Sequence, residues 1–129
     1  MVNCEGIGSS QSMEVVVTGP GGANRMFIYT GIAGFNFKGQ SGSFRYDSME
    51  FEIGRIFSRG QVLQIIAIGS LNRVFNNATA VNAGWSIENI NGRWDAVHGR
   101  VMVHADLGCS DSDGYLQKMG FQVIVLAKV

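Results

Sequence analysis

The sequence predicts an all-β protein of about eight antiparallel strands. Apolar and polar residues alternate with a period of two along most of the chain, and apolar residues at helical spacing are almost absent. The 129 residues include 18 glycines and one proline, so turns are frequent. A β-sandwich or an up-and-down barrel accommodates such strands. Strands longer than about ten residues favour the barrel, because closure leaves no long exposed edge.

The first part of the chain supplies a tail and two strands. Residues 1–12 are rich in Gly, Ser and Gln and are expected to form a flexible tail before a single β-barrel domain over residues 13–129. Apolar and β-branched residues predict strands over 13–18 and 25–30. The breakers of Gly19–Gly22 predict the turn between them.

Residues 35–47 admit two interpretations. Aromatic residues occupy odd positions at Phe35 and Phe37 but even positions at Phe44 and Tyr46, across a centre rich in Gly and Ser. Either a hairpin turns there, or one long strand carries a bulge that re-aims its side chains. The alternation of residues leaves both interpretations open.

The later strands have a clear pattern. They are predicted over 49–53, 61–70, 84–90, 97–107 and 115–128. The first of them is half-buried, because three apolar residues alternate with two glutamates. The last two are expected to pair as a hairpin across the turn-rich loop 109–114.

Side-chain alternation predicts which residues point inward. They are Met49, Phe51, Val101, Val103, Ala105, Leu107, Tyr115, Met119, Phe121, Val123 and Val125. Small Val103 and Ala105 would face large Phe51, Trp85 and Phe121, which either leaves a void or lets the side chains interdigitate. The residues alone favour a filled interior.

Composition excludes several classes of function. Ten basic and ten acidic residues give no net charge, which disfavours nucleic acid and anionic membranes as partners. Because an apolar run of ~20 residues and a secretory signal pattern are both lacking, we expect a cytoplasmic protein. Cys4 and Cys109 are expected to be free thiols. His98 and His104 would lie about 20 Å apart on a strand, too far to share a metal, so neither metal nor cofactor is expected.

Three short motifs resemble one family of β-barrels. Residues 92–99 read G-x-[aromatic]-x-x-[small apolar]-x-G and run into a predicted strand, like the signature before the penultimate strand of allene oxide cyclase and dirigent-like barrels. Residues 114–126, GYLQKMGFQVIVL, resemble the closing strand of dirigent proteins. Residues 39–46 resemble the G-x-S-x-x-F segment of small bacterial members that form spirotetronate and spirotetramate rings.

This resemblance implies an eight-stranded barrel, often dimeric, whose apolar lumen binds a hydrophobic substrate without a cofactor. It also implies that residues 35–47 are one bulged strand. The bacterial members fold a linear polyene for an intramolecular Diels–Alder reaction. The implied substrate-binding residues are Phe44, Met49, Phe51, Trp85, Val101, Val103 and Phe121.

The chain departs from the family on the penultimate strand. Val103 and Val101 stand where the cyclising enzymes carry a bulky aromatic residue and an arginine. Arg55 or Tyr46 could instead anchor the polar end of a substrate by charge-assisted hydrogen bonds. The alternative is that the alternation breaks near Gly54 and Arg55 is only solvated.

We therefore expect a cofactor-independent cyclase of bacterial natural-product biosynthesis, in which an apolar lumen folds a polyene for [4+2] cycloaddition. A non-catalytic dirigent- or lipocalin-like barrel that binds a small hydrophobic molecule is the first alternative. A structural β domain with a filled core is the second. A homodimer is expected in each case.

Overall fold

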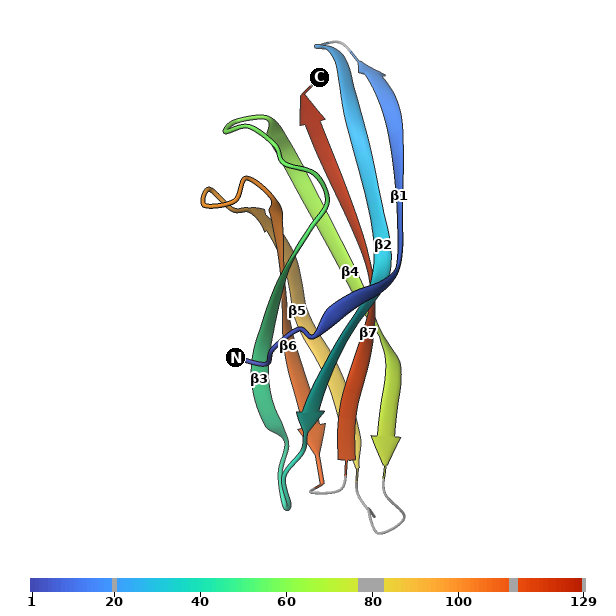
Figure 1. The fold of residues 1–129 in the computed structure, drawn as a ribbon, viewed down its shortest axis with the longest axis vertical. Coiled ribbons are helices and arrows are strands. Elements are labelled where there is room, and N and C mark those ends of the chain that lie inside the picture. Colours follow the sequence, from blue (N-terminus) through green and yellow to red (C-terminus); the bar gives the residue numbers. More distant parts are fainter. Residues whose placement is uncertain (20, 77–82, 112–113, 129) are drawn as a thin grey trace.

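The computed structural model describes residues 1–19, 21–76, 83–111 and 114–128, which form seven β-strands and no helix (Figure 1). The all-β prediction is confirmed. The strands are β1 Gly6–Gly19, β2 Gly22–Lys38, β3 Arg45–Ile53, β4 Val62–Asn76, β5 Gly84–Trp94, β6 Val101–Ser110 and β7 Gly114–Lys128. The described residues contain no helix that is long and apolar enough to cross a membrane.

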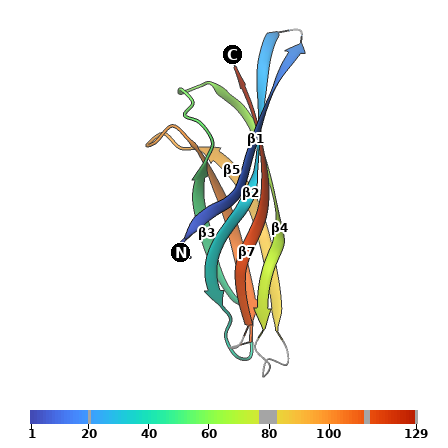
Figure 2. The same ribbon diagram turned by 45° about the vertical axis from the view of Figure 1, so that its right-hand side comes forward.

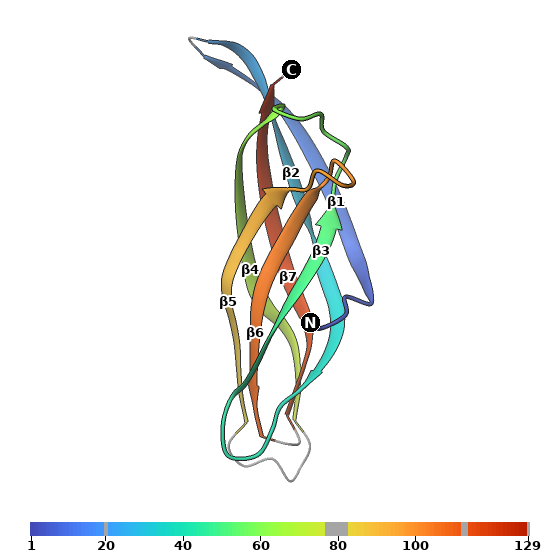
Figure 3. The ribbon, with the colours of Figure 1, turned by 90° about the vertical axis from the view of Figure 1, so that its left-hand side faces the viewer.

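The strands form two antiparallel sheets that pack face to face (Figure 3). The large sheet has the order β1-β2-β7-β4 and the small sheet the order β3-β6-β5. β4 lies beside β5 at one side of the molecule, and at the other Val2 donates its N–H to the carbonyl of Ser48 at 2.8 Å. The described residues form no closed hydrogen-bonded ring, so the eight-stranded barrel is not confirmed.

Strands that follow one another in the sequence seldom pair with each other in a sheet. Only β1–β2 and β5–β6 pair consecutively, so the order differs from that of an up-and-down meander. The predicted hairpin of the last two strands is wrong: β6 lies between β3 and β5, and β7 lies between β2 and β4. Each has two partners in its own sheet, and the two strands cover each other across the core. Residues 112 and 113 of the predicted loop lie outside the described part, as does Pro20 of the first predicted turn.

Residues 35–47 are neither a hairpin nor one bulged strand. β2 ends at Lys38 in the large sheet, and β3 begins at Arg45 in the small sheet. The aromatic residues change from odd to even positions where the chain passes from one sheet to the other. Phe35 and Phe37 are buried, whereas Phe44 is 40% exposed.

The core lies between the sheets. Its buried side chains come mainly from β2, β3, β6 and β7, as the alternation predicted for three of these strands. Tyr115 is the exception, because Leu116 takes the buried position and Tyr115 is half-buried. The partner strands carry bulges close to this point, which shifts the alternation of β7.

The segment predicted as a flexible N-terminal tail contributes to both sheets. Residues 6–12 belong to β1 and pair with β2, with one irregularity between Gly8 and Gln11. Before them, Val2 forms a bridge to Met49 of β3, so the N-terminal segment crosses from one sheet to the other (Figures 1 and 2). Gly, Ser and Gln adopt a strand here because their backbone groups pair along an exposed edge, where little side-chain burial is needed.

Candidate functional site

The residues predicted to line a lumen lie mostly in a packed core. Met49, Val101 and Val103 have no exposed surface. The rings of Phe51 and Phe121 contact each other across the sheets, with centroids 5.1 Å apart. Where the lumen was predicted, the side chains of the two sheets therefore interdigitate and fill the space.

Phe44 and Tyr46 lie away from this core. Their rings stack at 5.7 Å and are 40% and 60% exposed. Tyr46 covers Gly108, whose missing Cβ would fall 2.8 Å from the Tyr46 ring. Trp85 is half-buried against the core, and its buried indole N–H has no hydrogen-bond partner among the residues that the structure describes. The structure thus separates Phe44 and Tyr46 from Phe51 and Phe121.

A groove opens between β1 and the β2–β3 side of the sandwich, and we call it the β1–β3 groove. It consists of three adjoining depressions of about 570, 220 and 490 Å³ that share lining residues. Residues from β1 and the segment before it form one wall, and the end of β3 forms the other. It lies where the N-terminal segment leaves the large sheet for β3 (Figure 3).

The floor of the β1–β3 groove is aromatic. Phe27 and Tyr29 line the largest depression, and Phe51 and Phe121 line the two others. Phe27 stacks on Tyr29 at 6.4 Å and meets the edge of Phe57 at 5.2 Å. The rings offer an apolar surface at the base of a depression whose wall also carries polar Ser10, Ser12 and Glu14.

Arg55 is the cation over this floor. β3 ends at Ile53, and Gly54 follows with φ +74°. The inward–outward alternation of β3 therefore breaks at Gly54, as the second of the two interpretations of Arg55 expected. The Arg55 guanidinium lies 5.4 Å from the ring centre of Phe27 and 5.5 Å from that of Phe57. Its backbone N–H donates to the Tyr29 hydroxyl at 3.3 Å.

Arg55 also has no carboxylate partner among the residues that the structure describes. By contrast, Arg25 pairs with Glu14 in the same groove wall, and Arg100 lies 3.8 Å from Glu52. A guanidinium held against aromatic rings with its charge unpaired can receive an anionic oxygen.

An ionic cluster borders the groove at the end of β3. Glu52 bonds to the imidazole Nδ1 of His98, which is also 3.8 Å from Asp95. Arg100 donates from Nε to the Gly54 carbonyl at 2.9 Å. The hydrogen bond that the protonated His98 ring donates to Glu52 is the main cause that raises the pKa of His98, although the ring is exposed.

Glu52, Asp95 and His98 together offer three possible metal ligands within 4.8 Å of one another. The Arg100 guanidinium beside Glu52 already supplies positive charge there, which opposes a divalent cation. The expectation of no metal stays a prediction. Asp95 and His98 lie three residues apart in one segment, whereas Glu52 comes from β3, so the sequence did not mark the three residues as one cluster.

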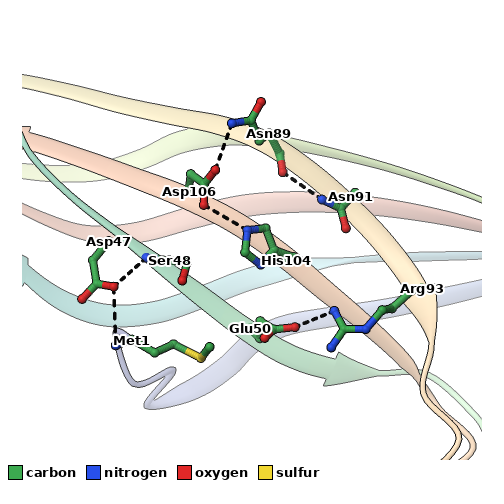
Figure 4. Close-up of polar contacts among 9 residues, drawn as sticks. All are labelled: Met1, Asp47, Ser48, Glu50, Asn89, Asn91, Arg93, His104 and Asp106. Carbon is green, nitrogen blue, oxygen red and sulfur yellow. Dashed lines mark hydrogen bonds and ion pairs between the residues drawn. The ribbon is translucent and has the colours of Figure 1, made fainter.

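The outer face of the small sheet carries a solvated polar network (Figure 4). The imidazole Nε2 of His104 lies 2.9 Å from a carboxylate oxygen of Asp106, and Asn89 donates to the same carboxylate at 2.9 Å. Both hydrogen bonds lower the pKa of Asp106, and the one from Asn89 has the larger effect. Arg93 pairs with Glu50 at 2.6 Å.

The two cysteines are free thiols, as expected. Cys4 lines the groove, and Cys109 is buried in the core. Burial raises the pKa of both thiols, which makes Cys4 a poor nucleophile at neutral pH.

Comparisons of the chain with known protein families, with curated proteins and with solved structures gave no match. The family resemblance therefore stays a prediction from three short motifs. The β1–β3 groove provides the geometry from which a function can be argued.

Proposed function

We propose that the protein binds an elongated, mainly apolar small molecule in the β1–β3 groove and holds its acidic end at Arg55. The acidic group would be a carboxylate or an acidic dicarbonyl. The unpaired Arg55 guanidinium above Phe27 and Phe57 carries this proposal. The two free cysteines agree with a reducing compartment, and we place the activity in the cytoplasm.

The dimensions of the groove support such a ligand. Its largest depression, about 570 Å³, lies within the ~300–1,000 Å³ typical of small-molecule sites. The apolar chain would lie along the aromatic floor toward Phe121. The acidic end would accept charge-assisted hydrogen bonds from the guanidinium, which the two rings hold in place.

The cyclase predicted from the family resemblance is a catalytic form of the same proposal. Arg55 would fix the dicarbonyl end while the floor restricts the polyene to conformers close to the [4+2] geometry. Such restriction can lower a barrier by up to ~7–11 kcal/mol. The family resemblance also implies a closed eight-stranded barrel that holds its substrate in a lumen. The site proposed here, in the groove, does not require such a barrel.

Calorimetric titration tests the binding proposal. The ligands are a long-chain carboxylate, the alcohol of the same chain length, and linear polyene tetronates and tetramates. We expect saturable binding of the acidic ligands and much weaker binding of the alcohol. Arg55→Gln should weaken binding of the carboxylate by about tenfold or more, because a charge-assisted hydrogen bond is lost.

Arg59→Gln is the matched control, since Arg59 lies 5.5 Å over the Trp94 ring and does not line the groove. It should leave the affinity unchanged. Equal affinity for carboxylate and alcohol, or equal losses in both variants, would rule out Arg55 as the anchor. No binding by any ligand would favour the structural β domain with a filled core.

Chromatography with mass spectrometry of the same mixtures then separates binder from cyclase. A product of unchanged mass but new retention time, lost in Arg55→Gln, identifies a cyclase. Recovery of the intact polyene from a saturated complex leaves a binding protein and removes the catalytic form of the proposal.

A further inference from the structure

The outer face of the large sheet, which looks away from the core, carries one row of apolar side chains that crosses all four strands. Register places Met13, Ile28, Ile124 and Ile66 side by side in one row from β1 to β4. Residues directly opposite one another in antiparallel strands point to the same face. Met13 is 61% exposed and Ile66 is 47% exposed, so the two ends of the row are open to solvent.

The neighbouring rows extend this surface, which we call the outer apolar face. On one side, Val15, Met26 and Leu126 form the next row, which ends at Gln64. On the other side, Ile68, 54% exposed, shares its row with the uncharged polar residues Gln11, Thr30 and Gln122. A depression of about 310 Å³ adjoins Ile68 where Gly120 provides no side chain. The face therefore has both protruding apolar side chains and a hollow that could receive one.

Charge is absent from these rows. Along β7 the nearest charged residues beyond them are Lys128 at one end and Lys118 at the other. The outer face of the small sheet is the opposite, since Glu50, Arg93 and Asp106 form its ion pairs and hydrogen bonds. A large apolar patch on only one of two outer faces indicates an interaction surface.

We propose that the outer apolar face docks on the same face of a second copy of this chain, with the two large sheets packed against each other. A partner for this surface must bring apolar groups and few charges, and the face itself meets that requirement. The chain has no net charge, so two copies do not repel each other as whole molecules.

The area is sufficient for a specific pair. A fourth outward row holds Gly8, Ile32, Gly120 and Ser70. Strands ~4.8 Å apart and four rows ~7 Å apart give a face on the order of 500 Å² per copy. Two such faces would bury on the order of 1,000 Å², about the least that a specific interface buries and below the ~1,200–2,000 Å² of standard interfaces. We therefore expect a homodimer of moderate affinity, with Lys118 and Lys128 on its rim.

Sedimentation velocity over about 1–200 μM protein tests this proposal. We expect a concentration-dependent dimer whose dissociation constant rises at least tenfold in Ile66→Glu and in Ile68→Glu. Both residues are about half exposed on β4, and circular dichroism will verify that each variant is folded. Ile56→Glu is the matched control, because Ile56 is 68% exposed outside the sheet, and it should dimerise as the wild type does.

Salt separates this interface from a lipid surface. Added NaCl should leave the dimer intact or strengthen it, because apolar contacts persist while repulsion between rim lysines is screened. A wild-type protein that stays monomeric at 200 μM, or a dimer unaffected by Ile66→Glu and Ile68→Glu, would overturn the proposal. Salt-sensitive binding of the monomer to phosphatidylserine vesicles, lost in Ile66→Glu, would assign the face to membranes instead.

Discussion

At the scale of single residues, the cations around the β1–β3 groove differ in how their charge is balanced. Arg55 lies on aromatic rings and has no carboxylate partner within the described ranges, whereas Arg100 lies beside Glu52. His98 is the cation whose charge depends on pH near neutrality. The groove therefore combines one permanent unpaired charge with a neighbouring ion pair that pH can remove.

His98 should titrate above the usual histidine value of about 6.5, because Glu52 stabilises the imidazolium. An NMR titration of its ring protons measures this pKa directly. Glu52→Gln should return the pKa toward the usual value, and Asp95→Asn should change it less, since Asp95 acts only through its more distant charge.

The same shift sets the direction of a stability effect. The folded protein binds the proton more tightly than the unfolded chain, so this contribution is complete below about pH 6.5 and is lost as the pH rises through the folded pKa. A wild-type pKa at or below the usual value would contradict the hydrogen bond between His98 and Glu52.

At the scale of elements, the end of β3 determines where Arg55 lies. Gly54 has a positive φ, and a Cβ at this position would fall 2.5 Å from the Tyr29 ring. Both features require glycine, and together they place Arg55 beside Tyr29.

Gly54→Ala should destabilise the protein more than Gly60→Ala. Gly60 has nearly the same φ, +77°, but no atom lies within 4 Å of its added Cβ. Backbone strain alone should cost about 1–2 kcal/mol in each variant. The contact with Tyr29 should add to this in Gly54→Ala, and urea unfolding measures the difference. Equal losses in the two variants would mean that Tyr29 moves aside freely.

The elements also show what can be predicted from sequence. Alternation identified the buried face of β3 from Met49 and Phe51 and that of β6 from Val101 to Leu107, because burial on one side imposes a period of two. Alternation does not select the neighbouring strand. The predicted hairpin at the C-terminal end and the interpretations of residues 35–47 were therefore wrong, although the buried faces were largely right.

The candidate site was predictable only in part. Arg55 was singled out because it was expected to continue the alternation of Phe51. The structure breaks that alternation at Gly54, and the contacts of Arg55 with Phe27 and Phe57 were not predicted. Phe27 and Tyr29 were missed as groove residues, because their role depends on β1 leaving the sheet above them. A tertiary arrangement of this kind leaves no spacing signal in the chain.

At the scale of the whole molecule, two sheets with a filled interior behave differently from a hollow barrel. In a filled core every buried methyl group has neighbours on all sides, and its removal leaves a void. In a hollow lumen the same group would already face open space. Stability measurements can therefore distinguish the two interiors.

Val103→Ala should lower the free energy of unfolding by about 2 kcal/mol, because Val103 has no exposed surface and its loss leaves a cavity. Val97→Ala is the control: Val97 is 81% exposed, and its loss should cost less than about 0.5 kcal/mol. Chemical denaturation measures both. A Val103→Ala variant as stable as Val97→Ala would indicate an open lumen around Val103.

The position of β7 has a consequence for how the chain is made. Of the seven described strands, β7 is synthesised last, yet it pairs with both β2 and β4 in the middle of the large sheet. On a ribosome, β1 and β2 can form their hairpin early but must wait for the C-terminal residues before their sheet closes over the core. Pairing between distant parts of a chain is slow, and waiting strands are open to aggregation. A nascent chain released before β7 therefore lacks the centre of its larger sheet and becomes a substrate for chaperones and proteases.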